Sequence, residues 1–280
     1  MKIMIRYGDG STAGNGHRVR MQRLAKVLGQ RGAEVNIQSA NFVEILDSLK
    51  RTPYDVLVMD VPENNNRELE AFRPHITRLA VIVGVGHTID TETSWIADTV
   101  IYQNMREWIE LIEAPSSMVL YGAEYLMVDP YSVSWRQSKP GTSIMTYFGA
   151  GFPANYAAGV TEELRRRMSP EIEVVDAWDE QWVKHAARAG LVVASMGMAV
   201  NEAVAVGTDV VTISVDDEHA EDAEELCELA SVLHVGTYAS VSPNALAKYA
   251  AKRYLNVERR PDEIPIDGMG VYRVARALLS

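Results

Sequence analysis

Short apolar runs alternate along the whole chain with segments whose apolar residues recur at helical spacing. In the first half these runs occupy residues 2–7, 34–38, 55–60, 78–84, 98–102 and 117–121. In the second half they occupy residues 143–148, 171–175, 190–194, 209–214 and 232–235. Strands that alternate with helices in this way are typical of βαβ units with parallel sheets. We therefore predict an α/β fold with two Rossmann-like domains.

The length of the chain and one break in its pattern predict where the domains divide. The 280 residues exceed an ordinary single domain, and the periodicity is lost between residues 132 and 142, where Ser, Pro and Gly accumulate. We expect an N-terminal domain at residues 1–136 and a C-terminal domain at 137–265. Residues 266–280 are expected to form a helix that packs back across the junction. Ligands of parallel sheets bind outside the carboxyl ends of the strands, so we expect the site in the cleft between the domains.

Charge and composition narrow the class of partner. The formal net charge of -11 disfavours a broad nucleic-acid or anionic-membrane surface, so DNA would need a local basic groove. The most apolar stretch, residues 191–213, is interrupted by Asn201, Glu202 and Asp209 and predicts no membrane span. A single cysteine and an opening strand without a signal-peptide pattern fit the cytoplasm. Small molecules are the expected partners.

A glycine loop at residues 13–20, with the sequence AGNGHRVR, joins the first apolar run to a helical segment. Gly14 and Gly16 allow backbone amides to approach an anion at the helix N-terminus, where the helix dipole adds positive partial charge. His17 stands where its imidazole could act on whatever is bound there. Arg20, one turn further on, either binds substrate or forms an ion pair on the surface. A tight turn in which His17 only caps the helix is the structural alternative.

Several segments, in chain order, resemble one known family. They are GxGHxxR at 14–20, YQN at 102–104, YGAEY at 121–125, FG at 148–149, SMGMAVNE at 195–202 and the terminal segment 267–275. Together they resemble the nucleotide-sugar hydrolases of the pseudaminic acid pathway and the related spore-coat polysaccharide proteins, within the MurG-like glycosyltransferase superfamily. The resemblance covers nearly the whole chain.

This resemblance implies a GT-B fold, a UDP-linked sugar as the substrate held mainly by the C-terminal domain, and no metal or other cofactor. Glu202 follows a small-residue loop at a strand end, where its carboxylate could accept hydrogen bonds from both ribose hydroxyls while loop amides face the diphosphate. A glutamate that merely favours the helix dipole is the alternative. With His17 as the catalytic base, the expected substrate-binding residues are Gly14, Gly16, Arg20, His87, Glu124, Gly149, Ser195, Met196, Gly197, Met198, Ala199, Glu202 and His219.

Two histidines in this set come from weaker patterns. His87 lies in a second Gly-x-Gly-His at residues 84–87. His219 follows Asp216, Asp217 and Glu218. An acidic first helical turn explains that cluster, a sugar-contacting loop is what the resemblance implies for it, and a metal site is the remaining alternative.

The sequence departs from the family pattern at three places, and all three bear on the reaction. Met196-Gly197-Met198 replaces a double glycine, residues 148–152 read FGAGF instead of FGGSD, and residues 84–87 replace paired aspartates. We rank hydrolysis with water first. Transfer to an alcohol, such as a sugar, a small metabolite or a hydroxylated nucleobase in DNA, is the alternative. A non-catalytic nucleotide-sugar binding protein is the second alternative, which the presence of His17 disfavours.

Overall fold

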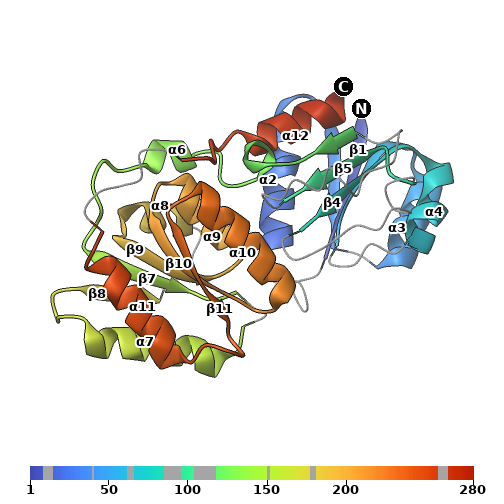
Figure 1. Cartoon of the computed structure of the whole chain (residues 1–280). Coiled ribbons are helices and arrows are strands. Elements are labelled where there is room, and N and C mark those ends of the chain that lie inside the picture. Colours follow the sequence, from blue (N-terminus) through green and yellow to red (C-terminus); the bar gives the residue numbers. More distant parts are fainter. Residues whose placement is uncertain are drawn as a thin grey trace. The chain divides into compact units, whose positions relative to one another are not determined.

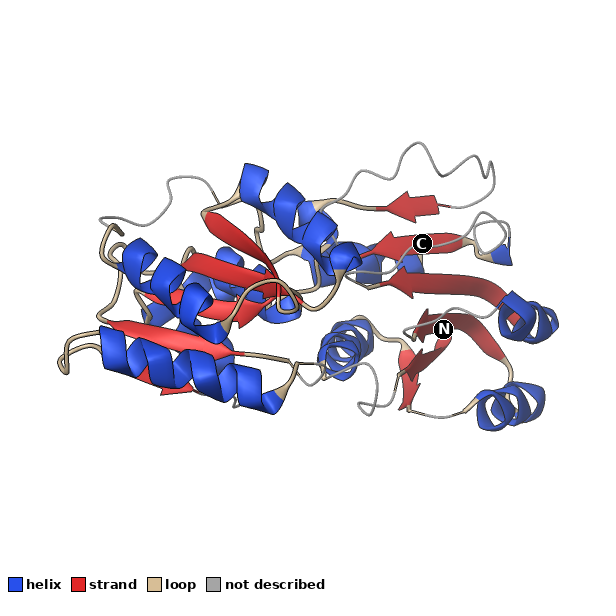
Figure 2. Cartoon of the chain, turned by 60° about the horizontal axis from the view of Figure 1, so that its bottom comes forward, coloured by secondary structure: helices blue, strands red, loops and turns tan. Residues whose placement is uncertain are grey.

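The computed structural model describes residues 1–8, 15–39, 41–61, 66–84, 96–103, 118–149, 152–176, 181–257 and 264–280. The chain forms two compact units (Figure 1). Unit 1 comprises residues 1–127 together with 269–280, and unit 2 comprises residues 128–268. Each unit contains a sheet with helices on its faces, as Figure 2 shows with strands in red and helices in blue.

The sheet of unit 1 has the strand order β2-β1-β3-β4-β5-β6, and every neighbouring pair is parallel. Its strands are β1 (Lys2–Tyr7), β2 (Glu34–Gln38), β3 (Tyr54–Asp60), β4 (Ile76–Val83), β5 (Thr99–Tyr102) and β6 (Met118–Leu120). The helices described in this unit are α2 (Gly16–Gln30), α3 (Phe42–Arg51), α4 (Asn66–Phe72), η1 (Arg73–His75), η3 (Ala123–Tyr125) and α12 (Gly270–Leu279).

Two apolar cores lie on opposite faces of this sheet. Successive side chains of a strand point to opposite faces, so Ile3 and Ile5 pack with α2 and α12, whereas Met4 packs with α3 and α4. Burial on both faces explains why the strands read as continuous apolar runs instead of alternating ones. The terminal helix α12 is part of this unit, and the Leu278 carbonyl accepts a hydrogen bond from Arg78 Nη2 at 2.6 Å.

The sheet of unit 2 has the strand order β11-β10-β9-β7-β8, again with parallel pairs throughout. Its strands are β7 (Ser143–Tyr147), β8 (Glu173–Asp176), β9 (Leu191–Ser195), β10 (Asp209–Ser214) and β11 (Val232–Thr237). The helices are α6 (Ser132–Trp135), α7 (Ala154–Arg167), α8 (Trp182–Arg188), α9 (Met198–Ala205), α10 (Asp217–Leu229) and α11 (Pro243–Tyr254). Helices α7 and α11 lie side by side on one face, and α8, α9 and α10 cover the other (Figure 1).

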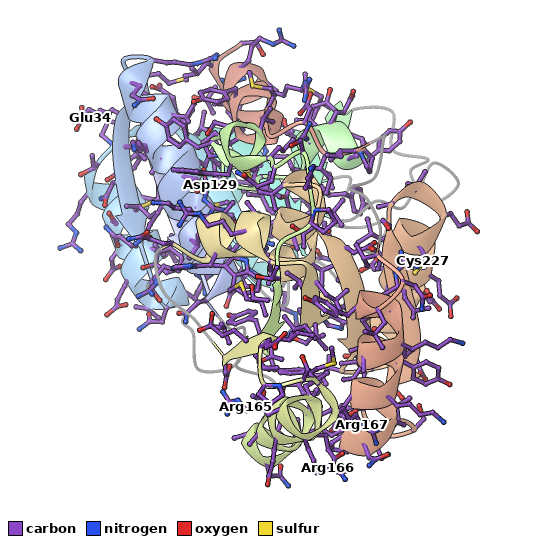
Figure 3. All side chains as sticks on the ribbon, turned by 90° about the vertical axis from the view of Figure 1, so that its left-hand side faces the viewer. Glu34, Asp129, Arg165, Arg166, Arg167 and Cys227 are labelled. Atoms are coloured by element: carbon purple, nitrogen blue, oxygen red, sulfur yellow. The ribbon has the colours of Figure 1, made fainter. Side chains whose placement is uncertain are left out.

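Helix α7 ends in three arginines, Arg165, Arg166 and Arg167, labelled in Figure 3. Cations in the last turn favour the helix dipole. Arg166 and Arg167 also pair with Glu163, at N–O distances of 2.6 and 3.5 Å. Arg165 Nη2 donates to the Val174 carbonyl of β8 at 3.2 Å, so each arginine of the basic run has a partner within unit 2.

The predicted α/β class is confirmed, because each predicted apolar run coincides with a strand of one of the two parallel sheets. Strand ends differ from the predicted ones by a few residues. None of the helices in the described ranges combines the length and the apolar composition that crossing a bilayer requires.

Candidate active site

His17 lies in the first turn of α2, directly after the loop that follows β1. The helix begins at Gly16, and the His17 side chain is almost entirely buried, with 7% of the residue exposed. Gly14, the other glycine predicted to face an anion, lies outside the described residues. The first turn of α2 therefore determines where the His17 side chain starts. The side chains that contact the ring determine which nitrogen can accept a proton.

Asp60 is the residue that His17 meets. It is the last residue of β3, it is 0% exposed, and its Cα partner on the neighbouring parallel strand β1 is Tyr7. The chain leaves β1 at that point toward α2, and the Gly8 amide donates to the Asp60 carbonyl at 2.9 Å. Sheet order thus brings the end of β3 beside the start of α2, although the two residues are 43 positions apart.

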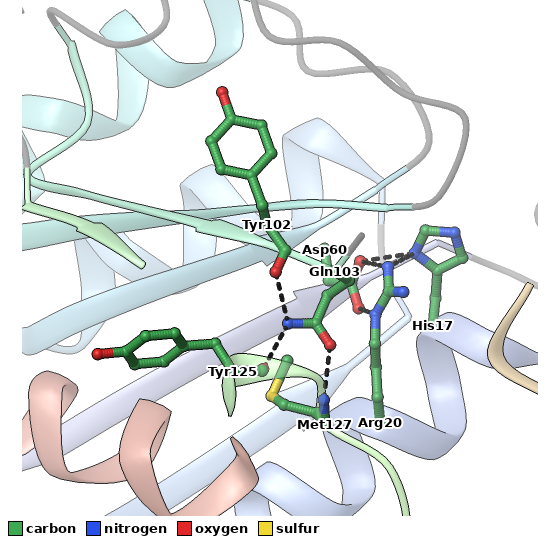
Figure 4. A network of polar contacts seen from close by, with 7 residues as sticks. All are labelled: His17, Arg20, Asp60, Tyr102, Gln103, Tyr125 and Met127. Carbon is green, nitrogen blue, oxygen red and sulfur yellow. Dashed lines mark hydrogen bonds and ion pairs between the residues drawn. The ribbon is translucent and has the colours of Figure 1, made fainter. Parts of the chain in front are cut away.

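Three side chains form one buried cluster, drawn in Figure 4. The distance from His17 Nδ1 to Asp60 Oδ1 is 2.6 Å. Arg20 donates twice to the same carboxylate, from Nε to Oδ2 at 2.6 Å and from Nη2 to Oδ1 at 2.5 Å. Arg20 Nη2 also lies 3.0 Å from His17 Nδ1. Of the two alternatives for Arg20, the structure gives it an ion pair, and this pair is buried.

The protonation state of Asp60 determines the tautomer of His17. Burial raises the pKa of Asp60, but the charge and hydrogen bonds of Arg20 and His17 lower it, and the net shift is downward. Asp60 is therefore a carboxylate at neutral pH and can only accept hydrogen bonds. His17 must then donate from Nδ1, and a neutral imidazole that donates from Nδ1 carries its lone pair on Nε2. The pair accordingly prepares Nε2 to accept a proton.

Gln103 organises a second buried network at the end of β5, also drawn in Figure 4. Its Nε2 donates to the carbonyls of Tyr102 at 3.2 Å and Tyr125 at 3.0 Å. Its Oε1 accepts from the Met127 amide at 2.9 Å. These bonds connect the segment after η3 to the carboxyl end of β5, so Gln103 has a structural role in this unit.

In unit 2, the predicted loop at residues 195–199 joins β9 to α9. Gly197 has a φ of 145° and a ψ of -160°, a backbone conformation that side chains disfavour. The Ser195 hydroxyl accepts a hydrogen bond from the Gly149 amide at 3.0 Å, which links this loop to the end of the neighbouring strand β7. Helix α9 starts at Met198, and the positive end of its dipole is at this loop. The structure therefore brings together Gly149 and the whole predicted run.

Glu202 lies in the second turn of α9 and is 2% exposed. Burial raises the pKa of the Tyr147 hydroxyl, and the negative charge of Glu202 raises it further. The Tyr147 ring stacks against the Trp182 ring, with 4.9 Å between the centroids. Glu202 is thus an almost completely buried carboxylate beside the carboxyl ends of β7 and β9.

The remaining predicted residues have contacts of their own. The Glu124 side chain, in η3, is exposed, and its carbonyl accepts from Arg273 Nη1 at 2.8 Å. His219 lies in the first turn of α10, where its amide and Nδ1 are 2.8 and 2.7 Å from Asp216 Oδ1. Asp216 is therefore the N-cap of α10, and the acidic cluster behaves as a helix start. His87 lies outside the described residues.

Asp60 is the residue that sequence reasoning missed. Its signal was a carboxylate directly after the apolar run Val56–Met59, because a charged side chain at the carboxyl end of a buried parallel strand is placed where ligands bind. Among the residues that the structure describes, no three His, Cys, Asp or Glu side chains are grouped in a way that could hold a metal ion.

Two Rossmann-like α/β units, each with a parallel sheet, are what the predicted GT-B fold requires. No family profile matches the chain, and a search of curated proteins gives no match. Solved structures do match over the full length. MurG of Acinetobacter baumannii has a TM-score of 0.65 and 12% identity, covering 99% of both chains. A UDP-GlcNAc 2-epimerase of Methanocaldococcus jannaschii, in complex with UDP-GlcNAc and UDP, has a TM-score of 0.64 and 13% identity, covering 100% of this chain and 99% of that one.

A third similar structure is Arabidopsis thaliana UGT89C1 complexed with quercetin, with a TM-score of 0.61 and 11% identity over 99% of this chain and 94% of that chain. At these identities the similarity establishes the shared fold. The function has to be argued from the residues of this chain.

Proposed function

We propose that this chain is an enzyme that uses a nucleotide sugar, UDP-linked, and breaks the bond between the anomeric carbon and the diphosphate oxygen. The observation that carries the proposal is the buried pair of His17 and Asp60, in which a 2.6 Å contact fixes Nδ1 as the donor and leaves Nε2 as the proton acceptor. The similar structures add support, since the M. jannaschii epimerase was solved with UDP-GlcNAc and UDP.

The proposed donor site is the loop after β9 in unit 2. Backbone amides at the start of α9 and the helix dipole would face the diphosphate, and Gly149 keeps the neighbouring loop close through its bond to Ser195. Glu202 would accept hydrogen bonds from the ribose hydroxyls. Because Glu202 is 2% exposed, ribose binding requires the side chains that cover the carboxylate to shift.

The proposed reaction is hydrolysis. The oxygen of a water molecule attacks the anomeric carbon, and its proton passes to His17 Nε2. The electron pair of the broken C–O bond leaves with the nucleoside diphosphate, whose charge the loop amides stabilise. The products are free sugar and UDP, and the imidazolium returns its proton to solvent. Asp60 orients the ring throughout, and its carboxylate stabilises the imidazolium that forms.

Transfer to a hydroxyl group is the second candidate. Its support is the replacement of polar and acidic residues of the family pattern by Gly, Val, Ala and Phe, on the two loops expected to border the acceptor, which contain residues 84–87 and 149–152. An acceptor pocket of this kind has to exclude water long enough for an alcohol to compete. UGT89C1, one of the similar structures, was solved in complex with quercetin, a molecule that carries hydroxyl groups.

The test is turnover of a panel of UDP-sugars in ¹⁸O-labelled water, followed by mass spectrometry. Hydrolysis predicts label in the free sugar at the rate of UDP release. Slow release that accelerates with an added acceptor, including hydroxymethylated DNA, would identify a transferase. UDP-sugar binding without turnover under any of these conditions would identify a binding protein and contradict the proposal.

His17→Asn is the variant that tests the base. It should reduce turnover about 10²- to 10⁴-fold, because it removes general-base catalysis, and it should leave UDP affinity nearly unchanged. Stopped-time assays with calorimetry on the same preparation separate the two effects. Unimpaired turnover in a folded His17→Asn protein would exclude His17 as the base.

A further inference from the structure

Arg20 occupies a position that substrate binding does not explain. The residue is 6% exposed, and two of its N–H groups are used on a carboxylate that is 0% exposed. Figure 4 shows the guanidinium alongside the Asp60 carboxylate, on the side of the cluster next to the imidazole. Arg20 therefore acts on the candidate site through its bonds to the Asp60 carboxylate.

The shared carboxylate oxygen is the key to its effect. Asp60 Oδ1 accepts from both Arg20 Nη2 and His17 Nδ1, while Oδ2 accepts from Arg20 Nε. A guanidinium bound through two parallel N–H groups fixes the plane of a carboxylate more firmly than one hydrogen bond does. The direction in which Oδ1 faces the imidazole is therefore set by Arg20.

Charge gives Arg20 a second effect. A buried carboxylate beside an imidazole on its own favours the protonated, cationic ring. Here the guanidinium cancels the charge of Asp60, and its Nη2 lies only 3.0 Å from His17 Nδ1, where it opposes a positive charge on the ring. Loss of the guanidinium would therefore leave the Asp60 charge uncompensated beside the ring.

We propose that Arg20 is a positioning residue of the candidate site, which orients the Asp60 carboxylate toward His17 Nδ1 and offsets its charge, so that Nε2 is presented as the proton acceptor. This inference rests on the proposed function in one respect, because that function supplies the proton that His17 accepts. The geometric part concerns the free protein and does not depend on the substrate.

Other charged groups of the described residues around the cluster are already paired. Arg6, the penultimate residue of β1, bonds to Glu68 of α4 at 2.6 Å. Arg23, one turn further along α2, donates to the Met127 carbonyl at 3.5 Å. Tyr7 lies beside Asp60 in the sheet, and Gln103 at the end of β5 is a neutral amide. Within the described part of the chain, Arg20 and Asp60 are the charged residues that contact the His17 ring.

The decisive variants are Arg20→Gln, which removes the charge, and Arg20→Lys, which keeps it but lacks the planar fork. Arg23→Gln is the matched control, since it removes an arginine of the same helix that does not bond to Asp60. Imidazole ¹⁵N NMR of the free protein reports the tautomer and the titration midpoint of His17. The pH profile of kcat/KM for UDP-sugar turnover reports the same group during the reaction.

We expect Arg20→Gln to move the His17 titration midpoint and the acidic limb of kcat/KM upward by about one pH unit, so that activity on that limb falls about tenfold. Arg20→Lys should show less than half of this shift but a lower kcat, because the carboxylate is less well oriented. Arg23→Gln should show neither effect. In an Asp60→Asn background, the Arg20→Gln change should raise the midpoint by less, since only the direct contact between Arg20 and the ring is then lost.

A folded Arg20→Gln protein with the wild-type midpoint would overturn the inference. If Arg20→Gln does not fold, the inference is tested with Arg20→Lys and with the His17 tautomer of the wild-type protein. An Nε2–H tautomer in the wild type would overturn the inference equally. Absence of turnover on every donor would count against the proposed function alone, because the NMR measurements on the free protein would still test Arg20.

Discussion

At the scale of single residues, Asp60 carries the charge on which the candidate site depends. Its carboxylate is completely buried, and its ionised form is stabilised by Arg20 and His17. The pKa of Asp60 is lowered in the folded protein, so in the unfolded chain the carboxylate binds a proton at a higher pH. The stability contributed by this ionised group is present above the unfolded pKa and is lost as the pH falls through the folded one.

We therefore expect the free energy of unfolding to fall on acidification below about pH 4, and Asp60→Asn to flatten part of that dependence. Urea titrations between neutral and acidic pH measure it. The control is Asp55→Asn on the same strand, an exposed position whose side chain accepts the Lys2 amide at 2.7 Å. If Asp60→Asn leaves the slope of stability against pH as in the wild type, the ion pair does not contribute as the structure implies.

The charge of Glu202 and its packing can be tested separately with two substitutions. Glu202→Gln preserves shape and removes the charge, whereas Glu202→Ala also leaves a gap at a position that is 2% exposed. Loss of charge-assisted hydrogen bonds worth roughly 1.5 to 3 kcal/mol should weaken UDP binding about ten- to a hundredfold in Glu202→Gln. Glu202→Ala should additionally lower thermal stability.

Isothermal calorimetry with UDP and thermal denaturation of the two Glu202 variants provide the measurements. Unchanged UDP affinity in a folded Glu202→Gln protein would rule out the ribose contact. Loss of stability in both variants with unchanged affinity would assign Glu202 a purely structural role.

At the scale of elements, the start of α9 depends on one glycine. Gly197 adopts a φ of 145°, and a Cβ built there meets nothing within 4 Å, so the cost of a side chain is conformational and not steric crowding. Gly197→Ala should destabilise unit 2 by about 1–3 kcal/mol and weaken UDP binding through a displaced helix start. Gly29→Ala, in open space within α2, is the control and should be neutral or stabilising.

Denaturant melts and UDP titrations of these two glycine variants check the expectation. Gly197→Ala with wild-type stability and affinity would mean that the loop relaxes without consequence for the site.

Strands and helices were predictable at this scale because their signals are local. Apolar runs such as 55–60 and 209–214 predicted strands directly, since both faces of each sheet are covered. Neighbouring residues also predicted the small-residue loop that precedes Glu202 and the position of His17 at a helix start. The pairing of His17 with Asp60 was not predictable in this way, because it follows from β3 lying beside β1, and nothing local to Asp60 encodes that sheet order.

The character of Arg20 was unpredictable for a related reason. Its spacing from His17 placed both residues on one face of α2, but the burial of its guanidinium depends on Asp60, 40 positions away. The helix start at Asp216 and His219, by contrast, could be predicted as an acidic first turn, because helix starts are encoded by neighbouring residues.

At the scale of the whole molecule, the core of unit 1 includes side chains from both ends of the chain. Val271, Val274, Ala275 and Leu278 of α12 pack with Ile3, Ile5 and α2. Deletion of residues 269–280 should therefore unfold unit 1, because it removes four fully or nearly fully buried apolar side chains at once. A fragment of residues 128–268, which holds all of unit 2, should fold without them.

Two-dimensional NMR spectra of the truncated chain and of the 128–268 fragment check this expectation. Dispersed signals for unit 1 in the truncated chain would show that α12 is dispensable for its core. A collapsed spectrum of the fragment would show that unit 2 needs the rest of the chain.

The return of α12 to unit 1 also sets an order for folding during synthesis. All of unit 2 emerges from the ribosome before α12 does, because unit 2 occupies the chain between the two parts of unit 1. The second sheet can therefore reach its native state while the first still lacks part of its core. The unit that carries the proposed base would obtain its full core only after α12 has emerged, so a nascent chain would assemble its His17 site later than its second sheet.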